Sequence, residues 1–326
     1  MAAATGSRPH RSSPASLWIR GQMYNAFFGF DAEPFRVNPD PRFLYFSESH
    51  REALATLVYA LHQRKGFIVL TGEVGTGKTT LLNALLQKLD PGVQGAYLFN
   101  TKLSLEDFFS YLFDELEIEP VEPFRKSAVL HRLNHYLIER LRKGQQTLLV
   151  IDEAQNLSDE LLEEIRMLSN LETPQSKLLQ IMLVGQPELD EKLAQPNLRQ
   201  LRQRIELRHT ISPLSLRETM EYVRERLLIA GHDNGEIFTT SALRTVYRYA
   251  AGIPRVVNVL CDNALLSAYV RKSLRVSARM IDETAKDLDL LREEVLPEQP
   301  AATPSARDGW IRRLWSGRRA QDELGA

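Results

Sequence analysis

A glycine-rich stretch from residue 72 to residue 80, GEVGTGKTT, contains the residue types that hold phosphate groups. Glycine accepts backbone conformations that other residues avoid, so successive N–H groups of such a loop can point at one anion beside a helix N-terminus. The spacing Gly72-x4-Gly77-Lys78-Thr79 places a lysine to reach the β- and γ-phosphates of a nucleotide and a hydroxyl to bind Mg²⁺. The stretch therefore predicts a P-loop for Mg-ATP. Its expected lining residues are Gly72, Glu73, Val74, Gly75, Thr76, Gly77, Lys78, Thr79 and Thr80.

A pair of carboxylates, Asp152 and Glu153, directly follows the apolar run 148–151. The run predicts a buried strand, and ligands of open parallel sheets bind at the carboxyl ends of the strands. Asp152 is placed to hold Mg²⁺ together with Thr79, and Glu153 to orient and polarise the attacking water. Because carboxylates after a strand also cap helices, this interpretation depends on the upstream P-loop.

Two further groups of polar residues have competing interpretations. Gln186 follows the apolar run 178–184, where its amide would either report the γ-phosphate or bond the backbone of a turn. Arg199, Arg202 and Arg204 precede a short strand. Such a run forms a solvated basic face by default, and the alternative is an arginine finger supplied to the nucleotide of a neighbouring subunit.

The elements expected to position these residues alternate between strands and helices. Strands are predicted before the P-loop and over 96–99, 148–151 and 178–184, with helices over 48–63, 104–116, 127–141 and 158–171. From residue 216 to residue 291 only helical patterns remain, over 216–230, 240–250, 254–270 and 278–291. An α/β domain followed by an all-helical domain is therefore expected. Between the second and third of these last helices, Pro254 suits a first helical turn and fixes Arg255 in it.

Both flanks of these domains differ from them in composition. Residues 1–22 are small, polar and basic, which predicts disorder. Residues 23–64 form an aromatic arm and a helix, and the prolines of the arm exclude one continuous helix. The arm is expected either to cover the core or to wall the adenine pocket. Residues 292–326 form a linker and a basic tail with Trp310 and Trp315, expected to be a solvated tail or docking peptide, with weak peripheral membrane contact as the alternative.

Composition limits the classes of protein further. The 41 Lys and Arg residues against 42 Asp and Glu residues give a net charge of -1, so the chain lacks the global positive field of a dedicated nucleic-acid binder. The single cysteine, Cys261, excludes an intrachain disulfide and fits a reducing compartment. No apolar run approaches the roughly 20 residues that cross a bilayer, and the start lacks a signal-peptide core. A cytoplasmic location is expected, with peripheral contact to the inner membrane left open.

Five features together resemble the AAA+ ATPase superfamily over residues 65–290. They are the P-loop, the acidic pair, the polar residue after the next strand, the arginine before a fifth strand and the GxPR turn. The opening block MYNAFFGF…PFRVNPDPRFLYFSESHREALATLVYAL, with GFIVLTGEVGTGKTT, LLVIDEAQNL and LVGQPEL, is similar to a narrower group. That group is the general secretion pathway protein A (ExeA-type) family, including its relatives in pilus, exopolysaccharide and exosortase loci.

This resemblance implies an α/β core with a five-stranded parallel sheet in the order 5-1-4-3-2, over residues 65–215, and an all-helical lid over 216–291. It implies Gln186 as sensor 1 and Arg255 as sensor 2, the latter contacting the nucleotide. Arg204 is implied as the finger, because the finger of the family stands immediately before the fifth strand, here expected to start at Ile205. The catalytic residues are then Glu153, Lys78, Arg204 and Gln186.

The function expected from this resemblance is hydrolysis of Mg-ATP to drive assembly of an envelope, secretion, pilus or exopolysaccharide system. Self-association into a ring or filament and an unidentified protein of that machinery are the expected partners besides ATP. The alternative is a DNA-associated AAA+ helper of the transposition or replication-initiation type. No basic DNA-reading element follows the lid, so nucleic acid is not the expected partner.

Overall fold

The structure, a computed structural model, describes residues 22–36, 41–43, 45–99 and 102–290 of the 326-residue chain. The described residues divide into two compact units. The α/β unit comprises residues 46–215 and 251–255, and the helical unit comprises the residues up to 45 together with 216–250 and 256–290. The expectations for residues 1–21 and for the tail beyond residue 290, including its two tryptophans, lie outside the described residues.

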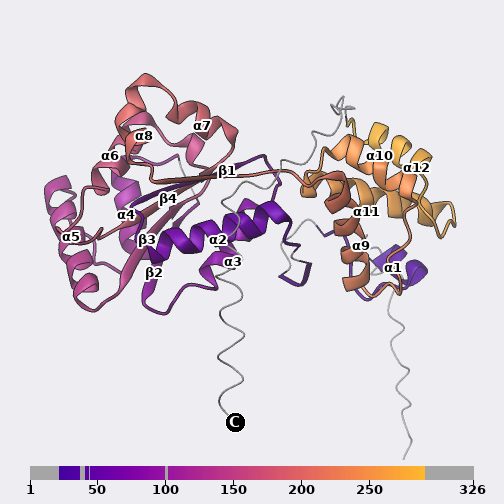
Figure 1. The fold of residues 1–326 in the computed structure, drawn as a ribbon, viewed down its shortest axis with the longest axis horizontal. Coiled ribbons are helices and arrows are strands. Elements are labelled where there is room, and N and C mark those ends of the chain that lie inside the picture. Colours follow the sequence, from indigo (N-terminus) through magenta and orange to yellow (C-terminus); the bar gives the residue numbers. More distant parts are fainter. Residues whose placement is uncertain (1–21, 37–40, 44, 100–101, 291–326) are drawn as a thin grey trace, which may run out of the picture. The chain divides into compact units, whose positions relative to one another are not determined.

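Five parallel strands form one sheet in the α/β unit, in the order β2-β3-β4-β1-β5 (Figure 1). This is the predicted order 5-1-4-3-2, read from the opposite edge. The fifth strand begins at Leu207 and not at Ile205 as expected, because Ile205 caps the preceding helix with its N–H on the carbonyl of Arg202. The strands are β1 (Phe67–Gly72), β2 (Val93–Leu98), β3 (Gln146–Ile151), β4 (Gln180–Gly185) and β5 (Leu207–Ile211).

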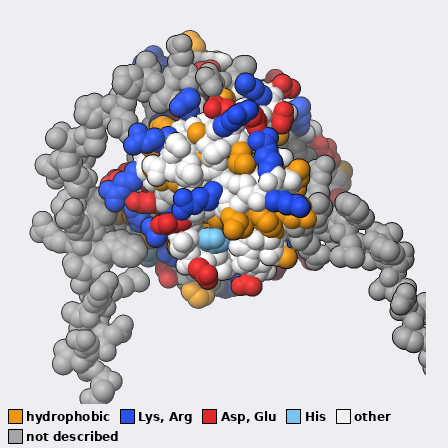
Figure 2. Space-filling model, turned by 90° about the vertical axis from the view of Figure 1, so that its right-hand side faces the viewer, with side chains coloured by type: hydrophobic (Ala, Val, Ile, Leu, Met, Phe, Trp, Pro, Cys, Tyr) orange, Lys and Arg blue, Asp and Glu red, His pale blue; other side chains and the backbone are white. Residues whose placement is uncertain are grey.

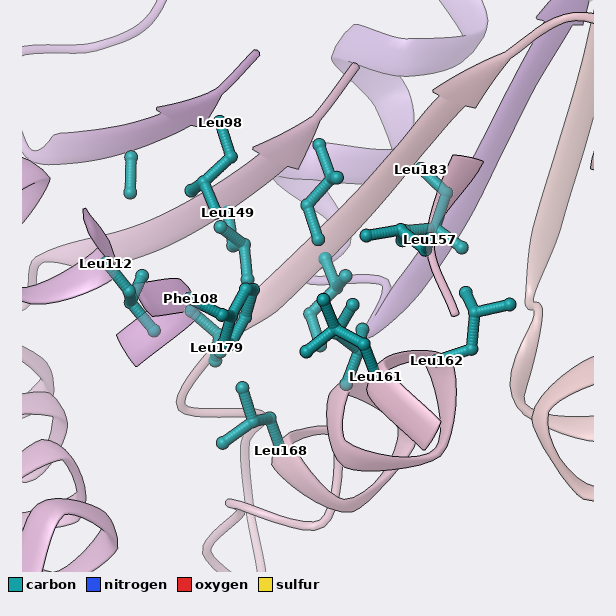
Figure 3. Close-up of a cluster of buried hydrophobic side chains, with 14 of the residues drawn as sticks. Leu98, Phe108, Leu112, Leu149, Leu157, Leu161, Leu162, Leu168, Leu179 and Leu183 are labelled. Atoms are coloured by element: carbon teal, nitrogen blue, oxygen red, sulfur yellow. The ribbon is translucent and has the colours of Figure 1, made fainter. Parts of the chain in front are cut away.

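Helices cover both faces of this sheet, because successive side chains of a strand point to opposite faces and the central strands are apolar on both. Phe67 and Leu149 pack in one core with the helices of the first face, and part of this core is drawn in Figure 3. Ile68 and Val150, the next residue of each strand, pack under α2 (Glu48–His62) and α3 (Lys78–Leu86) on the second face. The helices of the first face are α4 (Leu105–Glu115), α5 (Lys126–Arg142), α6 (Asp159–Leu168), α7 (Pro187–Leu193) and α8 (Arg199–Arg204), with the short turns η3 (Ala154–Asn156) and η4 (Pro196–Leu198).

The sheet also aligns the ends of its strands. Gly72 pairs with Ile211, and Ile151 pairs with Leu98 and Leu183. The carboxyl ends of β1, β3, β4 and β5 therefore lie along one edge, where the P-loop leaves β1 and enters α3. Every polar group that follows one of these strands is delivered to that edge.

The helical unit contains α9 (Leu216–Ile229), α10 (Thr240–Ala250), most of α11 (Pro254–Val270) and α12 (Ala278–Asp287), joined by α1 (Gln22–Phe28) and η2 (Pro41–Phe43) of the aromatic arm. Polar contacts help to hold the arm. Tyr24 donates to the carboxylate of Asp262, and Nε of Arg226 donates to the carbonyl of Pro34 at 2.5 Å. The guanidinium of Arg226 also stands 4.8 Å from the ring centre of Phe43. The arm thus covers the core of the helical unit.

Figure 2 looks onto the helical unit and shows Lys and Arg side chains spread over one face, with hydrophobic side chains between them. In the same unit, Arg271 and Arg279 bond the two oxygens of Glu283 at 2.6 Å and 3.0 Å. The whole chain has a net charge of -1, yet this face of the helical unit carries many Lys and Arg side chains.

A tight turn at Gly252 connects the segment 251–255 to the rest of the α/β unit. The N–H of Leu214 donates to the carbonyl of Gly252 at 2.9 Å, and a Cβ on Gly252 would stand 1.9 Å from the carbonyl oxygen of Leu214. Its φ of 75° is in the left-handed region. Both the conformation and the close approach of two backbones therefore require glycine here.

We expect Gly252→Ala to lower the free energy of unfolding by roughly 3 kcal/mol or more, because the added methyl group meets backbone that cannot rotate away. Gly144 is the matched control, with a φ of 73° and nothing within 4 Å of the added Cβ. Gly144→Ala should cost only about 1 kcal/mol, the strain of a left-handed alanine. Urea unfolding measures both; equal losses would contradict the clash at Leu214.

Candidate nucleotide-binding site

The P-loop between β1 and α3 has no room for side chains at its glycines. Gly75 and Gly77 have φ values of 83° and 96°, in the left-handed region. A Cβ on Gly75 would stand 2.6 Å from Cβ of Arg255, and one on Gly72 would stand 2.9 Å from the carbonyl oxygen of Ile211. The loop backbone therefore lies close to its neighbours between β1 and the N-terminus of α3, where the N–H groups of a glycine-rich loop can bind phosphate groups.

Lys78 is the first residue of α3, and its side chain folds back under this loop. Its side chain is buried, with 6% of the residue exposed, and Nζ donates to the carbonyls of Gly72 at 2.7 Å and Glu73 at 3.0 Å. Burial lowers the pKa of Lys78, while the charges of Glu153 and Asp152 act in the opposite direction. The ammonium group is thus held inside the loop, within electrostatic reach of both carboxylates.

Asp152 lies at the end of β3 among hydroxyl groups. Its Oδ2 accepts from Oγ1 of Thr79 at 3.2 Å and from the hydroxyl of Tyr97 at 3.0 Å, and its Oδ1 accepts from the N–H of Glu153 at 2.9 Å. Carboxylate and hydroxyl oxygens are suitable Mg²⁺ ligands, so Thr79 and Asp152 fit the ion they are predicted to hold. Among the described residues no cluster of three or more His, Cys, Asp or Glu side chains forms a metal site.

The sequence did not single out Tyr97. Burial, followed by the charge of Asp152 and the hydrogen bond to it, raises the pKa of this phenol well above its usual range, so it stays protonated and donates. The sequence predicts a strand over 96–99 that contains Tyr97, which is the one signal that could have placed it at the site; in the structure Tyr97 is the last residue but one of β2.

Glu153 is held by two amide side chains. Its Oε2 accepts from Nε2 of Gln155 at 2.6 Å and from Nε2 of Gln186 at 2.8 Å. Oε1 of Gln155 in turn accepts from the N–H of Gln186 at 3.2 Å. Glu153 itself has φ 52° and ψ 37°, a left-handed conformation that is strained for a residue with a side chain and that clusters at functional sites. The sequence did not single out Gln155 either.

The structure brings most of the predicted site residues together and leaves one apart. Residues 72–80, Asp152, Glu153 and Gln186 meet at the carboxyl edge of the sheet, and the N–H of Arg255 donates to the carbonyl of Gly75 at 3.3 Å. Arg204 ends α8 at the opposite edge, close to the amino ends of β1 and β5.

Comparison with known proteins agrees with this geometry. Residues 61–193 match the model of an AAA domain. The chain is 44% identical over 276 residues to General secretion pathway protein A of Aeromonas hydrophila, a match that covers 83% of this chain and 50% of that protein. The chain belongs to this family of AAA+ proteins. It spans half the length of this relative.

Solved structures with the same fold include Drosophila ORC bound to DNA, with a TM-score of 0.60, 18% identity and coverage of 89% of this chain and 71% of that chain. Cdc6p of Pyrobaculum aerophilum has a TM-score of 0.60 and 19% identity, with coverage of 81% and 75%. At these identities the likeness concerns the fold, an AAA+ α/β core with helical elements.

Proposed function

We propose that this AAA+ protein binds ATP with Mg²⁺ and hydrolyses it. The observation that carries the proposal is the meeting, at one edge of the sheet, of a buried lysine inside a phosphate-binding loop with the carboxylates of Asp152 and Glu153. Neither feature alone would be sufficient, since buried lysines and acidic pairs also occur in structural roles. Their common position fits transfer of a phosphoryl group.

In this proposal the loop N–H groups and Lys78 hold the β- and γ-phosphates. Nζ of Lys78, which bonds the carbonyls of Gly72 and Glu73 in the structure, would exchange these for phosphate oxygens. Mg²⁺, bound through Thr79 and Asp152, would supply positive charge that neutralises the phosphates. Residues 65–215 would act as the nucleotide-binding domain, and residues 216–291, with Arg255 at the turn, as the lid.

Glu153 would act as the general base. Water attacks the γ-phosphorus, its proton passes to the carboxylate, and the bond to the β-phosphate oxygen breaks so that ADP leaves with the bonding electrons. Both amides of the site bind Oε2 of Glu153, and no side chain among the described residues bonds Oε1. Oε1 is therefore the atom we assign to the water, with Gln186 holding the carboxylate and sensing the γ-phosphate.

The proposed process is assembly of an envelope, secretion, pilus or exopolysaccharide system, through self-association and a protein of that machinery. The identity of 44% to a secretion protein supports it, whereas the ORC and Cdc6p structures, at 18% and 19%, support a shared fold and not a shared task. None of the helices in the described residues is long and apolar enough to cross a bilayer. Action from the cytoplasm, at the inner-membrane surface, is part of this proposal.

Replacing Lys78 by Ala should weaken Mg-ATP binding by about 1.5–3 kcal/mol, because the variant loses a buried hydrogen bond to charged phosphate. Lys88→Ala is the control, since Lys88 is an exposed lysine one residue beyond the C-cap of the same helix. Calorimetry of both variants with Mg-ATP makes the comparison. Equal affinity of Lys78→Ala and Lys88→Ala would contradict nucleotide binding at this loop.

A complementation experiment tests the process. A strain lacking the gene should regain assembly of its secretion or surface system with the wild-type gene and not with the gene for Glu153→Gln. Full complementation by Glu153→Gln would separate that process from ATP hydrolysis.

A further inference from the structure

The first turn of α2 reaches the P-loop through a histidine that the mechanism above does not use. His50 is buried, with 7% of the residue exposed, and its Nε2 lies 2.8 Å from the carbonyl oxygen of Thr76. Its Nδ1 lies 2.6 Å from Oγ of Ser47, which is also buried. A residue 26 positions before Thr76 therefore contacts the backbone just before α3 begins.

The donors and acceptors of this contact follow from its chemistry. A carbonyl oxygen only accepts, so Nε2 carries the hydrogen and donates it to Thr76. When the ring is neutral, Nδ1 accepts from the hydroxyl of Ser47, while Oγ of Ser47 accepts the N–H of His50 at 3.3 Å as the N-cap of α2. The carbonyl of Thr76 thereby sets the tautomer of the imidazole, and Ser47 helps to hold its orientation.

This contact controls a peptide unit of the phosphate cradle. A trans peptide is planar, with its C=O and N–H pointing in opposite directions. Holding the carbonyl of Thr76 against His50 therefore turns the N–H of Gly77 away from the imidazole of α2. The φ of Gly77 is 96°, and a Cβ there would stand 3.0 Å from Nε2 of His50, so the ring lies directly against this peptide.

Such a restraint matters because glycine leaves the peptide free to rotate. Gly77 populates both signs of φ at little cost, so the peptide between residues 76 and 77 would otherwise sample orientations with the N–H turned out of the loop. The support is rigid. Oγ of Ser49 accepts the N–H of Ser212, just beyond β5, at 3.0 Å, and Leu57 of α2 is fully buried against the sheet.

We propose that His50 is a positioning residue of the P-loop: its Nε2–H fixes the carbonyl of Thr76 so that the N–H of Gly77 faces the nucleotide phosphates. The inference rests on the proposed binding of ATP at this loop. The contact of Gly77 with phosphate exists before and during the reaction, so its loss acts on ground state and transition state alike. The KM for ATP should then rise while kcat stays nearly constant.

The experiment compares three substitutions of His50 in the full chain. Gln carries an N–H donor at about the position of Nε2, Asn carries one at about the position of Nδ1, and Ala carries none. We expect His50→Ala and His50→Asn to raise the dissociation constant and the KM for Mg-ATP about tenfold, the effect of one hydrogen bond, and His50→Gln to restore most of both. His62→Ala, at the exposed C-terminal end of the same helix, is the control and should bind as the wild type does.

Amide hydrogen exchange of the nucleotide-free protein provides an independent measurement. Exchange in residues 72–78 should be faster in His50→Ala and His50→Asn than in the wild type and in His50→Gln. Equal exchange and equal affinity in all variants would overturn the positioning role, as would a Gln variant as weak as the Ala variant. A wild-type protein that bound no Mg-ATP would instead contradict the proposed function, and the exchange rates would still decide whether His50 orders the loop.

Discussion

Glu153→Gln is expected to bind Mg-ATP with nearly the wild-type affinity and to hydrolyse it about 10²–10⁴ times more slowly, the usual contribution of a general base. The amide has the shape of the carboxylate but cannot take a proton from water. Binding should persist because the phosphates are held by the loop backbone and Lys78, which the substitution leaves in place.

The measurement pairs calorimetry with steady-state release of phosphate. Glu160→Gln is the control, an exposed carboxylate in the first turn of α6 that should behave as the wild type. Glu153 sits between Gln155 and Gln186, so the variant can lose some order in these side chains, and its free energy of unfolding should be compared as well. Turnover within a factor of about ten of the wild type would remove Glu153 from the role of general base.

The parts of the site that the sequence predicted are those that depend on local backbone or on strand ends. The P-loop spacing requires only that a glycine-rich turn join a strand to a helix, as β1 and α3 do. Asp152, Glu153 and Gln186 were predicted because each follows an apolar run, and parallel strands end at one edge. The strand order itself came from the family resemblance, since no local pattern specifies which strands are neighbours.

The contacts that the sequence did not predict depend on register and on side-chain orientation between distant segments. Tyr97 reaches Asp152 only because Leu98 pairs with Ile151, which aligns the ends of β2 and β3. His50 reaches Thr76 because α2 packs on the same face as α3. Neither arrangement leaves a periodic signal in the sequence, so both residues resembled ordinary members of a strand and a helix.

Arg204 differs from all of these residues because the sheet separates it from the P-loop of its own chain. It ends α8, and Glu206, two residues later, donates its N–H to the carbonyl of Phe67 at the start of β1. From there β5 runs beside β1 until Ile211 pairs with Gly72, where the P-loop begins. The nearly extended residues 205–211 therefore separate Arg204 from the level of the P-loop by a distance on the order of 20 Å. Arg204 instead lies near Glu172, which precedes β4. Lys177 is the main cause that lowers the pKa of Glu172, and the positive charge of Arg204 makes a smaller contribution in the same direction.

A guanidinium so placed cannot contact a γ-phosphate held by Lys78 of the same chain. It can contact one held by an adjacent copy in a ring or filament, where it would neutralise charge that develops on the transferred phosphoryl group. Arg204→Ala is therefore expected to bind Mg-ATP almost normally and to hydrolyse it about 10³–10⁵ times more slowly at every protein concentration. Wild-type hydrolysis per subunit should rise with protein concentration, and Arg202→Ala, which removes an exposed arginine of the same helix, should retain most of it.

Mixing the two inactive variants separates action between copies from action within one. Lys78→Ala keeps an intact Arg204, and Arg204→Ala keeps an intact P-loop, so a junction between the two restores one complete site. Their mixture should then recover part of the wild-type activity that neither variant shows alone, whereas a finger acting within its own chain would give only the sum of the two. Sedimentation must show that the variants assemble together. If they do and the mixture gains nothing, Arg204 does not act between copies, and Arg202 and Arg199 become the residues to test in the same way.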